Sequence, residues 1–160
     1  MNESSASVKE LFRTSEAGKY ENLRRLLLNH KFEKEIIDIA IRKCLSKFNN
    51  NNNNYEESIK LLFSNGDLSY NNPNENNSNI LMILCRRGNN LIINKLLDGQ
   101  YLDKNKSPIE IDLFKVDNNK YNILHYLIKS ERNQELQAIT IFEKFMNYNN
   151  NINQKKIAKK

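Results

Sequence analysis

Residues 79–97 read NILMILCRRGNNLIINKLL and give the clearest indication of the fold class. Its apolar residues recur at the three- and four-residue spacing of one helix face, first over 79–86 and again over 91–97. Gly88 separates the two runs, at a position where a left-handed residue readily ends a helix. Helices this short are not stable alone in water. The stretch therefore predicts a helical hairpin that must pack against neighbours.

The same layout predicts three further helix pairs. Helices are expected at 8–15 and 22–28, at 35–48 and 56–63, and at 123–129 and 135–146. Gly18 divides the first pair, and an asparagine run divides the second. Helix pairs that stack on one another bury their apolar faces, which is how a repeat solenoid is stabilised. The sequence therefore predicts an all-α protein with a single solenoid domain at 8–146.

Laid over one another, the pairs resemble the ankyrin repeat. The ankyrin pattern has a leucine, two small residues, a glycine, a β-branched pair and then two leucines. The third helix pair has this spacing, with Leu81, Leu84, Cys85, Gly88, Ile92, Ile93, Leu96 and Leu97. In the fourth pair, Asn-Ile-Leu-His at 122–125 stands where ankyrin repeats have Thr-Pro-Leu-His. The chain thus resembles a degenerate ankyrin-repeat domain with units at about 8–34, 35–72, 73–112 and 113–146. A solenoid of another helical-repeat type is the structural alternative.

The chain departs from the ankyrin pattern at its helix starts and between its helices. No unit has the Thr-Pro pair, so we expect the helix starts to lack their usual cap. We expect a flexible N-terminus at 1–7, a flexible asparagine-rich insertion at 49–54, and a polar, basic tail at 147–160 that is compatible with a linker to further chain. Residues 101–115 alternate apolar and polar side chains, as in a half-buried strand. That segment is expected to pack on the stack as a hairpin finger or, alternatively, to face a partner.

The sequence contains no recognisable motif for catalysis, cofactor binding or metal binding. A metal site needs three or four convergent ligands, whereas Cys44, Cys85, His30 and His125 lie in separate segments. The four glycines are isolated at expected helix ends, so no phosphate-binding loop is indicated. His125 has no evident partner for acid–base chemistry, and the ankyrin resemblance implies a structural hydrogen bond across the turn between units. We expect a non-enzymatic protein without a cofactor.

The compartment follows from the apolar stretches and the cysteines. The longest apolar stretch, 80–85, is far below the roughly 20 residues that span a bilayer. Residues 1–10 lack the apolar core of a signal peptide. Cys44 and Cys85 are expected to be reduced core thiols. These features predict a cytoplasmic protein, with the nucleus as the alternative and no membrane insertion.

One set of residues predicts a binding surface. At equivalent positions of three successive units stand Ile39, Arg42 and Lys43, then Ile83, Arg86 and Arg87, then Tyr126 and Lys129. Residues three apart share a helix face, and the ankyrin resemblance places these positions on the concave surface of the stack. An apolar stripe bordered by cations suits an acidic, partly apolar segment of a partner protein. The alternative interpretation assigns the isoleucines to the core and the cations to a solvated face.

The expected function is therefore protein–protein recognition through the concave helix face and the hairpin fingers. The net charge of +6 favours acidic partners without indicating nucleic acid. Two alternatives stay open: a regulatory or targeting module of a larger enzyme, and a nucleic-acid-binding solenoid. The second is disfavoured because aromatic side chains are not interleaved with the cations.

Overall fold

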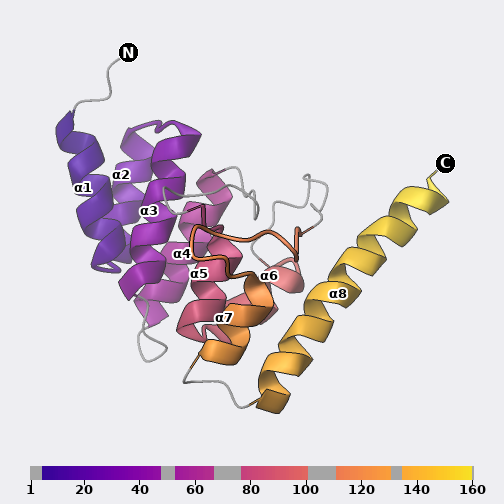
Figure 1. Ribbon diagram of the computed structural model, residues 1–160. Coiled ribbons are helices and arrows are strands. Elements are labelled where there is room, and N and C mark those ends of the chain that lie inside the picture. The colour runs from indigo at the N-terminus through magenta and orange to yellow at the C-terminus, as the bar shows by residue number, and fades with distance from the viewer. Residues whose placement is uncertain (1–4, 48–52, 67–76, 101–110, 131–134, 160) are drawn as a thin grey trace. The chain divides into compact units, whose positions relative to one another are not determined.

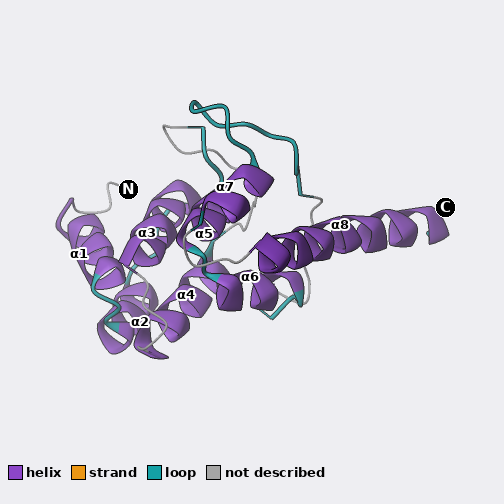
Figure 2. Cartoon of the chain, turned by 60° about the horizontal axis from the view of Figure 1, so that its bottom comes forward, coloured by secondary structure: helices purple, strands orange, loops and turns teal. Residues whose placement is uncertain are grey.

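The computed structural model describes residues 5–47, 53–66, 77–100, 111–130 and 135–159. Within these ranges the chain forms eight α-helices and no strand, so the prediction of an all-α fold is confirmed for this part of the chain (Figures 1 and 2). The helices are α1 (Ser5–Glu16), α2 (Tyr20–Asn29), α3 (Lys34–Lys47), α4 (Asn53–Asn65), α5 (Ile80–Arg87), α6 (Asn90–Leu97), α7 (Ile123–Lys129) and α8 (Glu135–Ala158). The chain divides into two compact units, Met1–Leu68 and Ser69–Lys160.

Both units use the same arrangement of helix hairpins. In the N-terminal unit, α1 pairs with α2 and α3 with α4, while α1 packs on α3 and α2 on α4. In the C-terminal unit, α5 pairs with α6 and α7 with α8, while α5 packs on α7 and α6 on α8. Each unit is thus two stacked hairpins in two layers. This packing lets short helices bury apolar faces that they could not bury alone.

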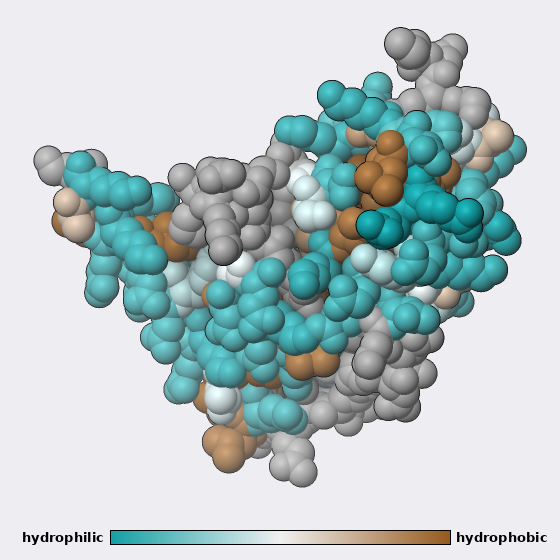
Figure 3. Space-filling view, turned by 180° about the vertical axis from the view of Figure 1, so that it is seen from behind, coloured by the Kyte–Doolittle hydropathy of each residue, from teal (hydrophilic) through white to brown (hydrophobic). Residues whose placement is uncertain are grey.

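Apolar residues at helical spacing form the core of each unit. In the N-terminal unit the buried set includes Leu11, Leu23, Ile37, Ile41, Leu45, Ile59 and Leu62. In the C-terminal unit it includes Leu81, Leu84, Ile92, Ile93, Leu96, Ile123, Leu127 and Phe145. On the face seen in Figure 3, the hydrophobic residues that remain exposed form separate patches among hydrophilic ones. No helix of the described residues is both long and apolar enough to cross a membrane.

The two cysteines are free thiols in these cores, as the sequence predicted. Both side chains are fully buried, Cys44 in α3 and Cys85 in α5. Burial raises the pKa of the Cys44 thiol to about 12 and raises the pKa of the Cys85 thiol as well. Neither sulfur is therefore a reactive thiolate near neutral pH.

The turn from α1 to α2 depends on Gly18, whose φ is +62°. The backbone N–H groups of Gly18 and Lys19 close the last turn of α1 with hydrogen bonds of 3.2 and 3.0 Å. The Tyr55 ring of α4 covers the turn, and its hydroxyl donates to the backbone oxygen of Glu16 at 3.1 Å. A Cβ atom at Gly18 would lie 2.9 Å from that ring. Both the backbone angle and the close approach therefore require glycine.

We expect Gly18→Ala to lower the free energy of unfolding by about 2 kcal/mol, since alanine resists a positive φ and its methyl group would displace the Tyr55 ring. Gly99→Ala is the matched control, because Gly99 has a φ of +74° with nothing within 4 Å of its would-be Cβ. Its cost should be about 1 kcal/mol, from the backbone alone. Urea unfolding followed by circular dichroism measures both, and equal losses would show that the Tyr55 contact is unimportant.

Two helix starts that were predicted to lack a cap in fact carry one. At α5, the Asn79 side-chain oxygen accepts the backbone N–H of Met82 at 2.8 Å. At α7, the Asn122 side-chain oxygen accepts the backbone N–H of His125 at 3.1 Å. Asparagine is among the best N-cap residues, and the same motif, Asn-Ile-Leu, opens both helices. Asparagine thus caps both helices, although neither start has a Thr-Pro pair.

Helix α8 is longer than the sequence predicted. It continues from Glu135 to Ala158, beyond the predicted end at residue 146 and through residues that were expected to form a polar, basic tail. The Asn149 side chain donates to the backbone oxygen of Ile111 at 2.7 Å and accepts the backbone N–H of Ile111 at 2.8 Å. Ile152, one turn further, is also buried. These contacts hold the polar half of α8 in helical form.

Three other segments differ in part from expectation. Helix α1 begins at Ser5, inside the stretch predicted to be flexible, while residues 1–4 lie outside the described part of the chain. Of the asparagine insertion, 49–52 also lie outside the described residues, whereas 53–54 form the start of α4.

Residues 101–115 are described only from Ile111 onward. Residues 111–115 form no strand, yet Ile111 and Leu113 are buried while Asp112 and Phe114 are exposed. The alternation of burial holds in the described part, and it reflects packing on the C-terminal unit.

Candidate functional site

A surface hollow of about 280 Å³ lies in the C-terminal unit between α5, α7 and the loop before α7. It is lined by Arg86, Asn119, Tyr121, Tyr126, Lys129 and Ser130, and we call it the α5–α7 hollow. Helix α5 provides Arg86, and α7 provides Tyr126 and Lys129. These three residues belong to the predicted binding surface, and the packing of α5 on α7 brings them to one place.

The loop before α7 is shaped by Asp117. One carboxylate oxygen of Asp117 accepts the backbone N–H groups of Asn119 and Tyr121 at 2.9 and 3.1 Å, as in an Asx turn. The backbone N–H of Asp117 donates to the backbone oxygen of Tyr121 at 3.0 Å. This closed loop fixes Asn119 and Tyr121 at the hollow.

The other carboxylate oxygen of Asp117 accepts hydrogen bonds from two hydroxyls. The Tyr126 hydroxyl donates to it, and the Ser78 hydroxyl donates at 3.3 Å. Burial raises the pKa of Asp117, but its hydrogen bonds outweigh burial and hold the pKa below the ordinary value of 3.8. Burial and the bond to Asp117 raise the pKa of Tyr126. At neutral pH, therefore, an ionised carboxylate binds a neutral tyrosine beneath the hollow.

Tyr121 holds the ammonium group of Lys129. The Lys129 Nζ atom donates to the Tyr121 hydroxyl at 2.8 Å and lies 4.2 Å from the centre of the Tyr121 ring, which adds a cation–π attraction. The Tyr121 ring in turn meets the Tyr126 ring edge-on, with centroids 5.6 Å apart. Arg86 is exposed and forms no hydrogen bond or ion pair with the described residues. The hollow thus combines two cations with two aromatic rings.

The remaining predicted residues of the C-terminal unit do not line this hollow. Ile83 and Arg87 are both half-buried. The Tyr126 side chain lines it but is itself only 6% exposed. The cations Arg86 and Lys129 are therefore more exposed here than Ile83 and Tyr126, the residues of the predicted apolar stripe.

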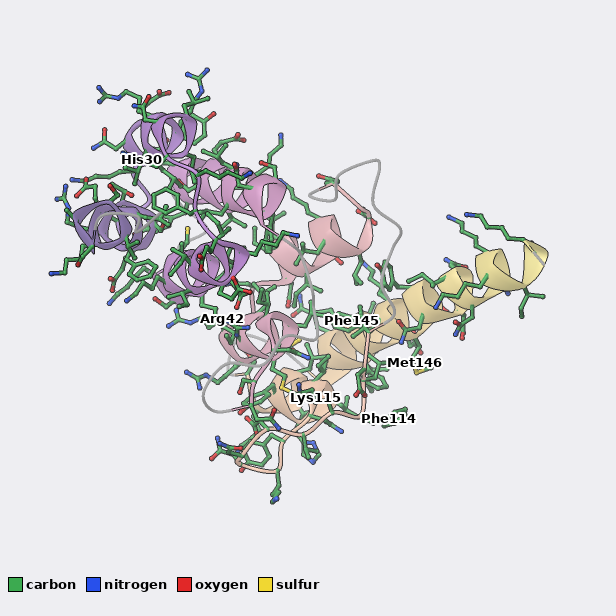
Figure 4. All side chains as sticks on the ribbon, turned by 90° about the horizontal axis from the view of Figure 1, so that it is seen from above. His30, Arg42, Phe114, Lys115, Phe145 and Met146 are labelled. Carbon is green, nitrogen blue, oxygen red and sulfur yellow. The ribbon has the colours of Figure 1, made fainter. Side chains whose placement is uncertain are left out.

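The predicted residues of the N-terminal unit all lie on α3. Ile39 is 42% exposed. The guanidinium of Arg42, which Figure 4 labels, is paired with the carboxylate of Asp38, one turn earlier, at 2.9 Å. Lys43 lies 5.6 Å from the centre of the Phe12 ring. Both cations of this group already have partners within their own unit.

His125 takes part in the start of α7. Its Nδ1 atom accepts the backbone N–H of Asn122 at 3.2 Å, which completes a capping box with the Asn122 side chain. Its ring stacks on that of Tyr121, with centroids 5.6 Å apart. His125 is exposed, and its hydrogen bonds to the described residues are local, whereas the ankyrin resemblance implied a bond across the turn between repeat units.

Sequence reasoning missed the loop residues that complete the hollow, Asn119 and Tyr121, together with Asp117 beneath it. The available signal was Asp-Asn-Asn at 117–119, because aspartate and asparagine favour Asx turns. Reading that turn would have placed Tyr121 beside the start of α7.

The described residues contain no cluster of three or more histidine, cysteine or acidic side chains that could hold a metal ion. Tyrosine, serine, asparagine and two cations line the hollow instead. Their chemistry is that of recognition by charge and hydrogen bonding. No protein-family model, no curated protein and no solved structure matches this chain.

Proposed function

We propose that this chain is a non-catalytic, ankyrin-type interaction module that binds an acidic, partly apolar segment of a partner protein. The observation that carries the proposal is the meeting of Arg86, Tyr126 and Lys129 at the α5–α7 hollow. An exposed arginine and tyrosines in a concave site are typical of residues that dominate binding energy.

The helix arrangement supports a repeat protein. Each unit stacks two hairpins in the same two-layer order, and the turns after α1 and α5 both use a left-handed glycine, Gly18 and Gly88. Repeat proteins use the surface of such stacks for binding. The proposal includes a second contact area on α3, formed by Ile39, Arg42 and Lys43. This area is the weaker candidate because Arg42 and Lys43 already have partners within their own unit. The two buried, free thiols favour a reducing compartment, the cytoplasm or the nucleus.

A capture experiment tests the function. The full chain is immobilised as wild type, as Arg86→Glu/Lys129→Glu, and as the control Arg24→Glu/Arg25→Glu, whose residues are exposed on α2. Proteins retained from a native lysate are quantified by mass spectrometry. We expect proteins that the wild type and the control retain and that the α5–α7 variant loses, because charge reversal replaces attraction with repulsion.

Two results would count against the proposal. Equal retention by all three proteins would move the contact elsewhere. Retention of nucleic acid alone, with a steep dependence on salt, would indicate a polyanion binder.

A further inference from the structure

The α5–α7 hollow presents hydrogen-bond donors to solvent in an arrangement that fits one kind of ligand group. We propose that it binds the carboxylate of a single aspartate or glutamate side chain of the partner, with Tyr121 as a specificity-determining donor beside Arg86 and Lys129. This inference rests on the proposed function and specifies its chemistry.

The hydrogen bonds already made decide which donors remain. Lys129 donates to the Tyr121 hydroxyl oxygen, so the hydrogen of that hydroxyl is left for another acceptor. Lys129 keeps two of its three N–H groups, and the guanidinium of Arg86 is exposed. The Tyr126 hydroxyl is excluded because its hydrogen is committed to Asp117. A carboxylate accepts hydrogen bonds without donating any, so it matches this set.

The charge of the site selects a monoanion. Arg86 and Lys129 contribute two positive charges, and the ionised Asp117 beneath Tyr126 contributes one negative charge. Among the described residues one positive charge is thus left over, and a single carboxylate neutralises it. A phosphate group carries about −1.5 to −2 charges at neutral pH, so it would leave the site negative.

The hollow is large enough for an acidic side chain. Its volume of about 280 Å³ lies just below the roughly 300–1,000 Å³ of typical small-molecule pockets. The Tyr121 and Tyr126 rings stand edge to face and offer apolar surface to the methylene groups that carry the carboxylate. An acidic side chain can therefore place both its charge and its stem here.

Peptide titration of the full, ¹⁵N-labelled chain tests the proposal. The first probe is a blocked leucine–glutamate–leucine peptide, and the second has glutamine in place of glutamate. We expect the first to shift the amide signals of Arg86, Asn119, Tyr121 and Ser130 and to saturate in the millimolar range. The glutamine peptide should bind at least about fivefold more weakly, because bonds to charged groups are the stronger ones.

Tyr121→Phe isolates the hydroxyl, because phenylalanine keeps the ring that packs on Tyr126 and faces Lys129. It should weaken binding of the glutamate peptide about fivefold and that of the glutamine peptide less, because a hydrogen bond to a neutral amide oxygen is weaker than one to a carboxylate. Tyr20→Phe, in the N-terminal unit, is the control and should change neither. If Tyr121→Phe disturbs folding, Lys129→Gln removes one cation of the site instead and should also weaken the glutamate peptide more than the glutamine peptide.

Several results would overturn the inference. These are equal binding of the glutamate and glutamine peptides, an unchanged affinity in Tyr121→Phe, or tighter binding of a phosphoserine peptide. Tighter binding of a peptide with a free carboxyl terminus would identify a chain end as the ligand instead. Failure of the proposed function has a different signature: the immobilised wild type would then retain no protein from the lysate. If captured proteins depend on Arg86 and Lys129 but the glutamate peptide does not bind, only the carboxylate inference is wrong.

Discussion

Replacing Phe145 with alanine is expected to lower the free energy of unfolding of the C-terminal unit by about 3–5 kcal/mol. Phe145 is fully buried and is among the largest side chains of the core. It lies on α8, which packs on α6 and α7. Deleting its ring leaves a cavity that short helices fill poorly. Chemical denaturation followed by circular dichroism measures the loss.

Met146→Ala is the matched control, one residue further along the same helix. Met146 is 43% exposed, and Figure 4 labels it beside Phe145 on α8. Its replacement should change stability by no more than about 0.5 kcal/mol. Equal losses in the free energy of unfolding for the two variants would mean that burial of Phe145 does not stabilise the packing of α8.

Asp117→Ala should destabilise the C-terminal unit by about 3 kcal/mol, because its carboxylate accepts several hydrogen bonds in a buried position. The alanine variant leaves the Tyr126 and Ser78 hydroxyls and the two loop N–H groups without this acceptor. Asp117→Asn should lose less, since its amide oxygen can still accept the two N–H groups and hydroxyls can rotate to accept. Denaturation of the three proteins at neutral pH gives the ranking.

The same variants separate the contribution of the charge by pH. The pKa of Asp117 is lower in the folded protein than its ordinary 3.8. The ionised carboxylate therefore stabilises the fold above about pH 4, and this stability is lost as the pH falls through the folded pKa. We expect the difference between wild type and Asp117→Asn to shrink on acidification below about pH 4. A difference that stays constant down to pH 2 would show that the charge is unimportant.

Helical periodicity in the sequence predicted the helices whose apolar residues are dense. The hairpin of α5 and α6 is the clearest case, because Leu84, Ile92 and Leu96 recur at helical spacing around Gly88 and are fully buried. Strong periodicity and a left-handed glycine are local signals, so they can be read without knowing the rest of the fold.

The polar half of α8 could not be predicted in this way. Residues after Met146 are rich in asparagine, which has a modest helix propensity. Their helical form coincides with tertiary contacts, chiefly the hydrogen bonds of Asn149 to the main chain of Ile111 and the burial of Ile152. Contacts between residues far apart in sequence override weak propensity, and a single sequence does not reveal them.

The candidate site was predicted in part for a related reason. Aligning the helix pairs in the sequence predicted that Arg86 and Lys129 lie together, and both line the hollow. Tyr121 lies at the hollow because Asp117 closes the loop that carries it. Loops lack hydrophobic periodicity, so the sequence did not predict where this side chain points.

The carboxamide of Asn149 also bears on self-association. Residues 111–114 alternate buried and exposed side chains although they form no strand, and main-chain groups left exposed at a protein surface can pair with a strand from another molecule. Asn149 occupies both the donor and the acceptor of Ile111. At this one residue, therefore, a strand from another molecule would meet main-chain groups that are already hydrogen-bonded.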